Sequence, residues 1–210
     1  MKGLKGAVAL FVFGGMMVSS CVKHEIIPAP EAVVDLNCYF QGFINGTDVE
    51  LTQNVNGYTC NPTKEKIIVP APEYSSAIYY AEMSSATTPI FIKVGMGSVM
   101  WDAATVQDPT LTLFNNFFLN NLNPAYSDDA TAGFEVQYRD NAGNIWLSHE
   151  NSVNAQNVVF SNIKQESDAY GDYSAFTCAF NCYVYKQDQT TMAWDSIQIQ
   201  NAVYKGWFKR

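Results

Sequence analysis

Basic residues are scarce in this chain of 210 residues: Lys and Arg together number 12, against 20 Asp and Glu. Nucleic-acid binding depends on clustered Lys and Arg that neutralise phosphates, so this composition argues against a nucleic-acid partner. The sequence also has no long run of like charge and no repeat of fixed period, which are typical of disordered tails and solenoids. We therefore expect an acidic globular protein.

Catalytic and metal-binding motifs are missing as well. The sequence contains no nucleophile elbow, phosphate-binding loop, His-Glu-x-x-His or Cys-x-x-Cys. Ser148-His149-Glu150 has the residue types of a hydrolytic triad, but neighbours on a strand project to opposite faces. We expect no metal, no cofactor and no enzymatic activity; a hydrolase that uses His149 as its base remains the alternative.

The apolar run Gly6–Val18 holds only 13 residues, fewer than the roughly 20 that a membrane-spanning helix needs. Lys2 and Lys5 precede this run and Ser19-Ser20 follow it, which is the layout of a secretory signal. We therefore expect residues 1–20 to be a signal peptide and the protein to be exported.

The segment Val18-Ser19-Ser20-Cys21 resembles the lipobox of bacterial lipoproteins, in which the signal is cut before the cysteine and the thiol carries a diacylglycerol. The resemblance implies lipid attachment at Cys21 and a place in the bacterial envelope, at the outer membrane. Residues 21–32 include Pro28 and Pro30 and predict an extended tether, so that 33–210 form a single domain. The periplasmic and surface faces of the membrane both remain open.

Four cysteines remain after lipidation, an even number that favours disulfides in an exported protein. Cys178 and Cys182 lie four residues apart in an expected strand, which separates their Cα atoms by roughly 13 Å, whereas a disulfide needs about 7 Å or less. We therefore predict that Cys38 and Cys60 each bond to one member of that pair. Four reduced, buried thiols are the alternative.

Alternating apolar and polar residues predict a series of strands. The expected strands are 36–44, 47–51, 77–83, 90–94, 133–139, 145–149, 157–165, 173–185 and 196–208. Asn45-Gly46 and the segment 140–144 suit turns, while 53–62 reads as a loop that holds Cys60. In the last strand the apolar parity reverses after Ile199, which predicts a bulge near Asn201.

One helix is expected from Asp108 to Asn121. Asp108 suits the N-cap and Pro109 the first helical position. Leu111, Phe114 and Phe118 fall on one stripe that would pack against the sheet. The predicted fold class is therefore mainly all-β, an antiparallel β-sandwich or partly open barrel with one packed α-helix.

Three segments resemble small, functionally uncharacterised Bacteroidetes lipoproteins: Asn45-Gly46 at the end of the first strand, 176–185, and the terminal strand 197–208 with Asn201, Tyr204, Gly206 and Phe208. The resemblance implies an antiparallel β domain and supplies no activity.

Aromatic residues are abundant, with 4 Trp, 12 Tyr and 13 Phe. Aromatic faces can stack on sugar rings, so Tyr183, Tyr185, Trp146 and Trp194 are the candidate ligand contacts; a second packed layer is the other interpretation. We expect a lipid-anchored binding module for a glycan or another envelope protein. A structural envelope component without a ligand is an alternative.

Overall fold

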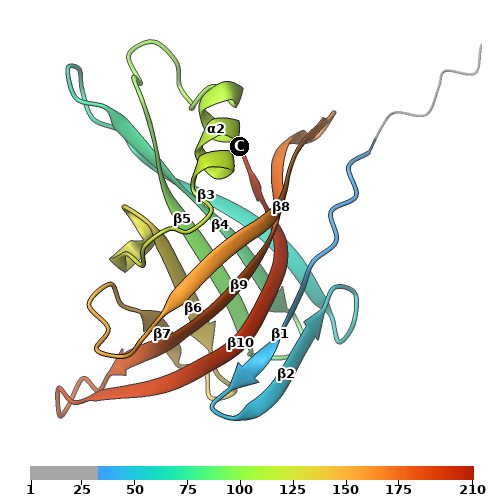
Figure 1. Ribbon diagram of the computed structural model, residues 1–210, viewed down its shortest axis with the longest axis vertical. Helices are drawn as coiled ribbons and strands as arrows, with labels where there is room; N and C mark the ends of the chain where they lie inside the picture. Colours follow the sequence, from blue (N-terminus) through green and yellow to red (C-terminus); the bar gives the residue numbers. More distant parts are fainter. Residues whose placement is uncertain (1–32) are drawn as a thin grey trace, which may run out of the picture. The chain divides into compact units, whose positions relative to one another are not determined.

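The computed structural model describes residues 33–210, which form a mainly antiparallel β domain with one packed α-helix (Figure 1). This arrangement confirms the predicted fold class. The predicted signal peptide, the tether and Cys21 lie outside the described residues. The elements are β1 (Tyr39–Ile44), β2 (Thr47–Thr52), β3 (Tyr58–Ile67), β4 (Ser75–Ser85), β5 (Phe91–Trp101), α2 (Leu111–Asn120), the 3-10 turn η1 (Asp128–Ala130), β6 (Phe134–Arg139), β7 (Ile145–Ser148), β8 (Asn157–Asp168), β9 (Gly171–Gln187) and β10 (Trp194–Lys209).

The strands form one sheet in the order β2-β1-β10-β9-β7-β6-β5-β4-β3, and β8 pairs with residues 171–181 of β9. The ladder is open, because β2 and β3 are its end strands and do not pair with each other. The sheet nevertheless curls far enough for β3 and β4 to contact β10. The inner face of the curl therefore encloses a single core (Figure 1).

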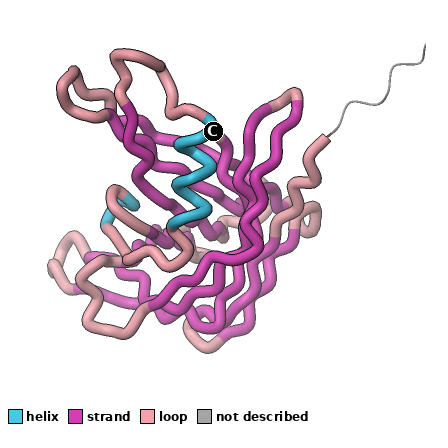
Figure 2. Tube along the Cα trace, turned by 45° about the horizontal axis from the view of Figure 1, so that its top comes forward, coloured by secondary structure: helices cyan, strands magenta, loops and turns pink. Residues whose placement is uncertain are grey.

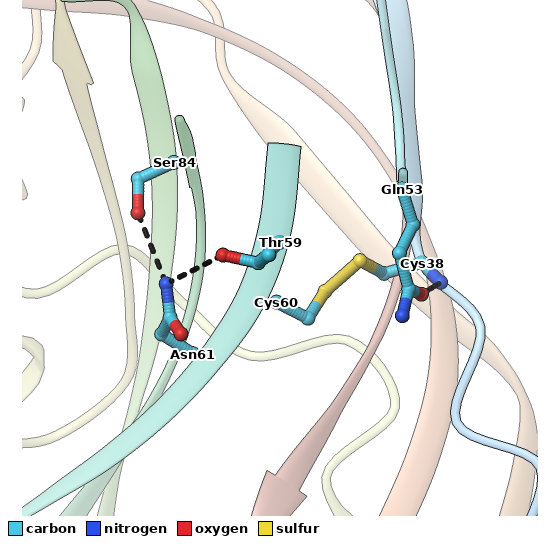
Figure 3. The surroundings of a disulfide bond; sticks show 6 residues. All are labelled: Cys38, Gln53, Thr59, Cys60, Asn61 and Ser84. Atoms are coloured by element: carbon cyan, nitrogen blue, oxygen red, sulfur yellow. Dashed lines mark hydrogen bonds between the residues drawn. A yellow bond between two sulfur atoms is a disulfide. The ribbon is translucent and has the colours of Figure 1, made fainter. Parts of the chain in front are cut away.

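A disulfide between Cys38 and Cys60 links the start of β1, next to one end of this ladder, to the end strand β3 (Figure 3). Cys38 directly precedes β1 and Cys60 lies in β3, with Cα atoms 6.4 Å apart. The predicted pairing with β9 is wrong, because Cys178 and Cys182 are both free thiols buried in the core. Burial raises the pKa of both thiols.

The hairpin of β9 and β10 forms the centre of the sheet. Phe176, Phe180 and Val184 of β9 all face the core, as their alternation predicts. The ring of Phe176 stacks on that of Phe208 from β10 with centroids 4.5 Å apart. The predicted bulge is confirmed, because the register shifts between Ile199 and Ala202 and Asn201 has a φ of 49°.

The helix α2 lies across the open inner side of the sheet (Figure 2). Phe114 and Phe118 enter the core, where Phe118 stacks on Phe208 at 4.6 Å. The predicted N-cap is wrong: the side chain of Thr110 accepts the capping hydrogen bond from the Leu113 amide.

Asp108 instead pairs with two lysines of β3, at 2.7 Å from Lys64 Nζ and 3.3 Å from Lys66 Nζ. These contacts hold the pKa of its carboxyl below the usual range, although partial burial opposes the shift. No helix within residues 33–210 has the length and apolar character that spanning a membrane requires.

The prediction of a loop at residues 53–62 is also wrong for its second half, because β3 begins at Tyr58 and includes Cys60 and Pro62. Pro62 pairs with Ala81 on one side only, since β3 is an end strand of the ladder. Proline is tolerated in a strand at such an edge, where its missing N–H removes no hydrogen bond from the sheet.

Candidate functional site

A short segment around η1 crosses the outer face of β4, β5 and β6. Ala130 packs there against Ile78 and Tyr80, a small cluster separate from the main core. The segment lies so close to β5 that a Cβ atom at Gly97 would collide with the Ala130 carbonyl oxygen, so glycine is required at this point. Asp129 and Ala130 have φ values of 56° and 52°, a left-handed backbone that non-glycine residues rarely adopt.

This segment holds Asp128 next to His149, which follows β7. Oδ1 of Asp128 lies 3.0 Å from His149 Nδ1 and accepts a hydrogen bond of 3.0 Å from the Glu150 amide. The Gln156 side chain also donates to the His149 carbonyl at 2.8 Å. Contacts to both its ring and its backbone therefore fix the orientation of His149.

A hollow of about 340 Å³ opens beside this pair, and we call it the aromatic hollow. It is lined by Asp128, His149, Asn151, Ser152, Val153, Tyr185 and Trp194. Trp194, the first residue of β10, is 55% exposed and meets the His149 ring edge-on, with centroids 5.1 Å apart. The ring centroid of Tyr185 in β9 lies 5.7 Å from that of His149. Three aromatic rings, from β9, β10 and the residue after β7, therefore surround one concave surface.

The phenol of Tyr185 is held by the loop between β7 and β8. Its hydroxyl lies 2.8 Å from Ser152 Oγ and accepts a hydrogen bond of 3.1 Å from Asn154 Nδ2. The hydroxyl of Ser152 thus bonds to Tyr185 rather than to His149. The hollow combines fixed aromatic surface with polar groups at its edge, which is the composition of many small-molecule sites.

Two of the four predicted ligand contacts, Tyr185 and Trp194, therefore line the aromatic hollow. Tyr183 is half-buried and lies outside its lining. Trp146 is 8% exposed, and its indole N–H donates to Asp140 Oδ2 at 2.9 Å. The structure thus brings only half of the predicted set together.

Ser148, the last residue of β7, and His149, which follows the strand, lie in different surroundings. The buried Ser148 hydroxyl accepts a hydrogen bond from the Val136 amide, while His149 lines the hollow. Sequence reasoning missed Asp128 as the partner of His149, because 21 residues separate the two and only the crossing of η1 over the sheet joins them.

A larger groove of about 600 Å³ lies between the segment 35–39, β8 and the outer face of β10. Its one tryptophan, Trp207, is half-buried and packs edge-on against Tyr173 at 5.4 Å. Charges of both signs line this groove, including Lys205 and Glu166. It offers no exposed aromatic platform, so we regard the aromatic hollow as the better candidate site.

Within residues 33–210, no three side chains of His, Cys, Asp or Glu gather closely enough to hold a metal ion. No family model matches the chain, and no curated protein or solved structure is significantly similar to it.

Proposed function

We propose that this protein is a lipid-anchored component of the bacterial envelope that binds a glycan without catalysis, and that the aromatic hollow holds the glycan. The observation that carries the proposal is the exposed ring of Trp194 beside His149 and Tyr185 in a concave surface. A sugar ring presents an apolar face and a polar edge, which suits an aromatic platform bordered by polar groups. The volume of about 340 Å³ fits a short segment of a sugar chain.

The absence of catalysis is proposed from the arrangement of the hydroxyl groups. A hydrolytic triad needs a nucleophile within hydrogen-bond reach of its base. Ser152 shares the hollow with His149, but its hydroxyl is engaged with Tyr185 at 2.8 Å. The contact of 3.0 Å between His149 and Asp128 favours a hydrolase as the second candidate, since a carboxylate also orients the base of a triad.

Glycan-array screening of the full chain tests the first candidate. We expect binding that weakens at least tenfold in Trp194→Ala, because truncating a central aromatic contact commonly costs 2 kcal/mol or more. Met192→Ala is the matched control, since Met192 is 61% exposed on the same hairpin but lies outside the hollow.

A hydrolase panel run on the same preparation tests the second candidate. Hydrolysis that is lost in a folded His149→Ala variant would replace binding with catalysis as the function. If no glycan binds and a pull-down from solubilised membranes recovers a partner through Trp194, the ligand is another envelope protein. Failure of all three assays would favour a structural role without a ligand.

A further inference from the structure

The end of the sheet at which the chain enters the domain forms a continuous rim, which we call the entry rim. It consists of the β3–β4 turn (68–74), the segment 102–110, the β8–β9 turn (169–170) and residues 209–210, all near the top of Figure 1. Four polar contacts involve these parts or the strand residues that adjoin them: Lys66 Nζ to Asp108 Oδ1 (3.3 Å), Arg210 Nη1 to Pro109 O (3.1 Å), Arg210 Nε to Asp172 Oδ2 (2.7 Å), and Val34 N to Asp168 Oδ2 (3.2 Å).

Large apolar and aromatic side chains project from the entry rim into solvent. Tyr170 is 71% exposed, Tyr74 63% and Ile68 58%, and Val33 is equally open where the chain enters. Lys209 and Arg210 lie beside them at the end of β10. Tyrosines combined with basic residues are typical of protein surfaces at the boundary between lipid and water.

The aromatic hollow lies at the other end of the same strands. β9 starts at Gly171 in the entry rim and reaches the hollow at Tyr185, about 45 Å further along at 3.3 Å per residue. Acidic residues lie at both ends, with Asp128 and Glu150 at the hollow and Glu73, Asp102 and Asp108 in the entry rim. The hollow and the entry rim are therefore well separated on the domain.

We propose that the entry rim rests on the lipid bilayer and that the aromatic hollow faces away from it. This inference depends on the lipid anchor in the proposed function. Val33 follows Cys21 by twelve positions in the sequence, and a stretch of this length spans about 40 Å when fully extended and about 20 Å as a flexible chain. Turning the hollow toward the bilayer would require the tether to cross about 45 Å, which is more than its fully extended length.

The test uses the full lipidated chain in vesicles of phosphatidylethanolamine and phosphatidylglycerol that contain a headgroup quencher. A fluorophore is attached at Ala169→Cys in the entry rim or at Gln189→Cys in the β9–β10 turn, both exposed positions. Cys178 and Cys182 are buried and do not compete for the label. We expect at least threefold stronger quenching at position 169, reduced by half or more when Tyr74→Ser and Tyr170→Ser are added.

Equal quenching at the two positions in vesicle-bound protein would contradict the proposed orientation but would leave the proposed lipid anchor unaffected. A chain that does not float with the vesicles, in the same way as Cys21→Ser, would overturn both the anchor and the inference. A position 169 that is unquenched in vesicles but shielded in native membranes would show that a protein, not lipid, covers the entry rim.

Discussion

The two faces of the β9–β10 hairpin use the same kind of side chain for opposite purposes. On the inner face, the rings of Phe176 and Phe208 stack on each other and are 2% or less exposed. At the far end of the outer face, Tyr185 and Trp194 border a hollow that stays open to solvent. Whether an aromatic residue of this hairpin belongs to the core or to the candidate site thus depends on the face of the sheet to which it points and on whether another element packs over that face.

The largest expected effect of a substitution lies on the inner face. Phe176→Ala should lower the free energy of unfolding by about 3–5 kcal/mol, because it leaves a cavity among closely packed rings. Trp194→Ala is the matched outer substitution and should change it by no more than about 0.5 kcal/mol. Urea denaturation measures both, and similar losses in the two variants would break the distinction between the faces.

Removal of the disulfide should cause the second-largest loss in the free energy of unfolding. Removing it in the double variant Cys38→Ala/Cys60→Ala is expected to cost about 3 kcal/mol, since it closes a 22-residue separation in the unfolded chain.

Cys178 and Cys182 should remain unreactive toward a thiol reagent until the protein unfolds, because both are fully enclosed by the core. Rapid modification of either thiol in native protein would contradict this assignment.

Glu135 offers a pH-dependent test of the region beneath η1. Burial raises the pKa of its carboxyl above the ordinary value, so the folded state holds this proton more tightly than the unfolded state. Stability from this group is therefore present at low pH and is lost as the pH rises through the folded-state pKa. Glu135→Gln has no carboxyl to ionise and should not show that loss. The free energy of unfolding of the variant relative to the wild type, measured by urea titration, should therefore rise between about pH 4 and pH 7. A constant difference across this range would contradict the prediction.

A loss of stability well below those of Phe176→Ala and of disulfide removal is expected at the edge of the aromatic hollow. Tyr185→Phe removes the hydroxyl that contacts Ser152 and Asn154, at a cost of about 1 kcal/mol in stability. Hydrogen exchange in the loop 149–156 should become faster while the core amides keep their protection. Unchanged exchange in this loop would show that the hydroxyl does not hold it.

Local patterns predicted most of the sheet. The hairpin at Asn45-Gly46, the long pair β9 and β10, and the bulge at Asn201 depend on residues that are close in sequence or on strict alternation. The N-cap was predicted wrongly because Asp108 and Thr110 both suit that position, and Lys64 and Lys66 from β3 engage Asp108 instead. Local propensity cannot choose between them.

The other differences between the predictions from the sequence and the structure result from the curl of the sheet. Cys60 meets Cys38 only because β3 returns to the vicinity of β1, and Pro62 is tolerated only because β3 has a free edge. Two of the seven residues that line the candidate site, Tyr185 and Trp194, were predicted as ligand contacts from their aromatic side chains. Asp128 was not, because its contact with His149 depends on how closely η1 approaches Gly97.

The Cys38–Cys60 bond also determines how the domain carries mechanical load. Tension applied to the chain before residue 38 passes through the sulfur atoms directly into β3. The β1–β2 hairpin lies between the two cysteines and is bypassed, so a pull cannot peel β1 away from β10. In the reduced protein the same pull would act on β1 first. Protection of the β1–β2 hairpin from such a pull therefore depends on the oxidised bond.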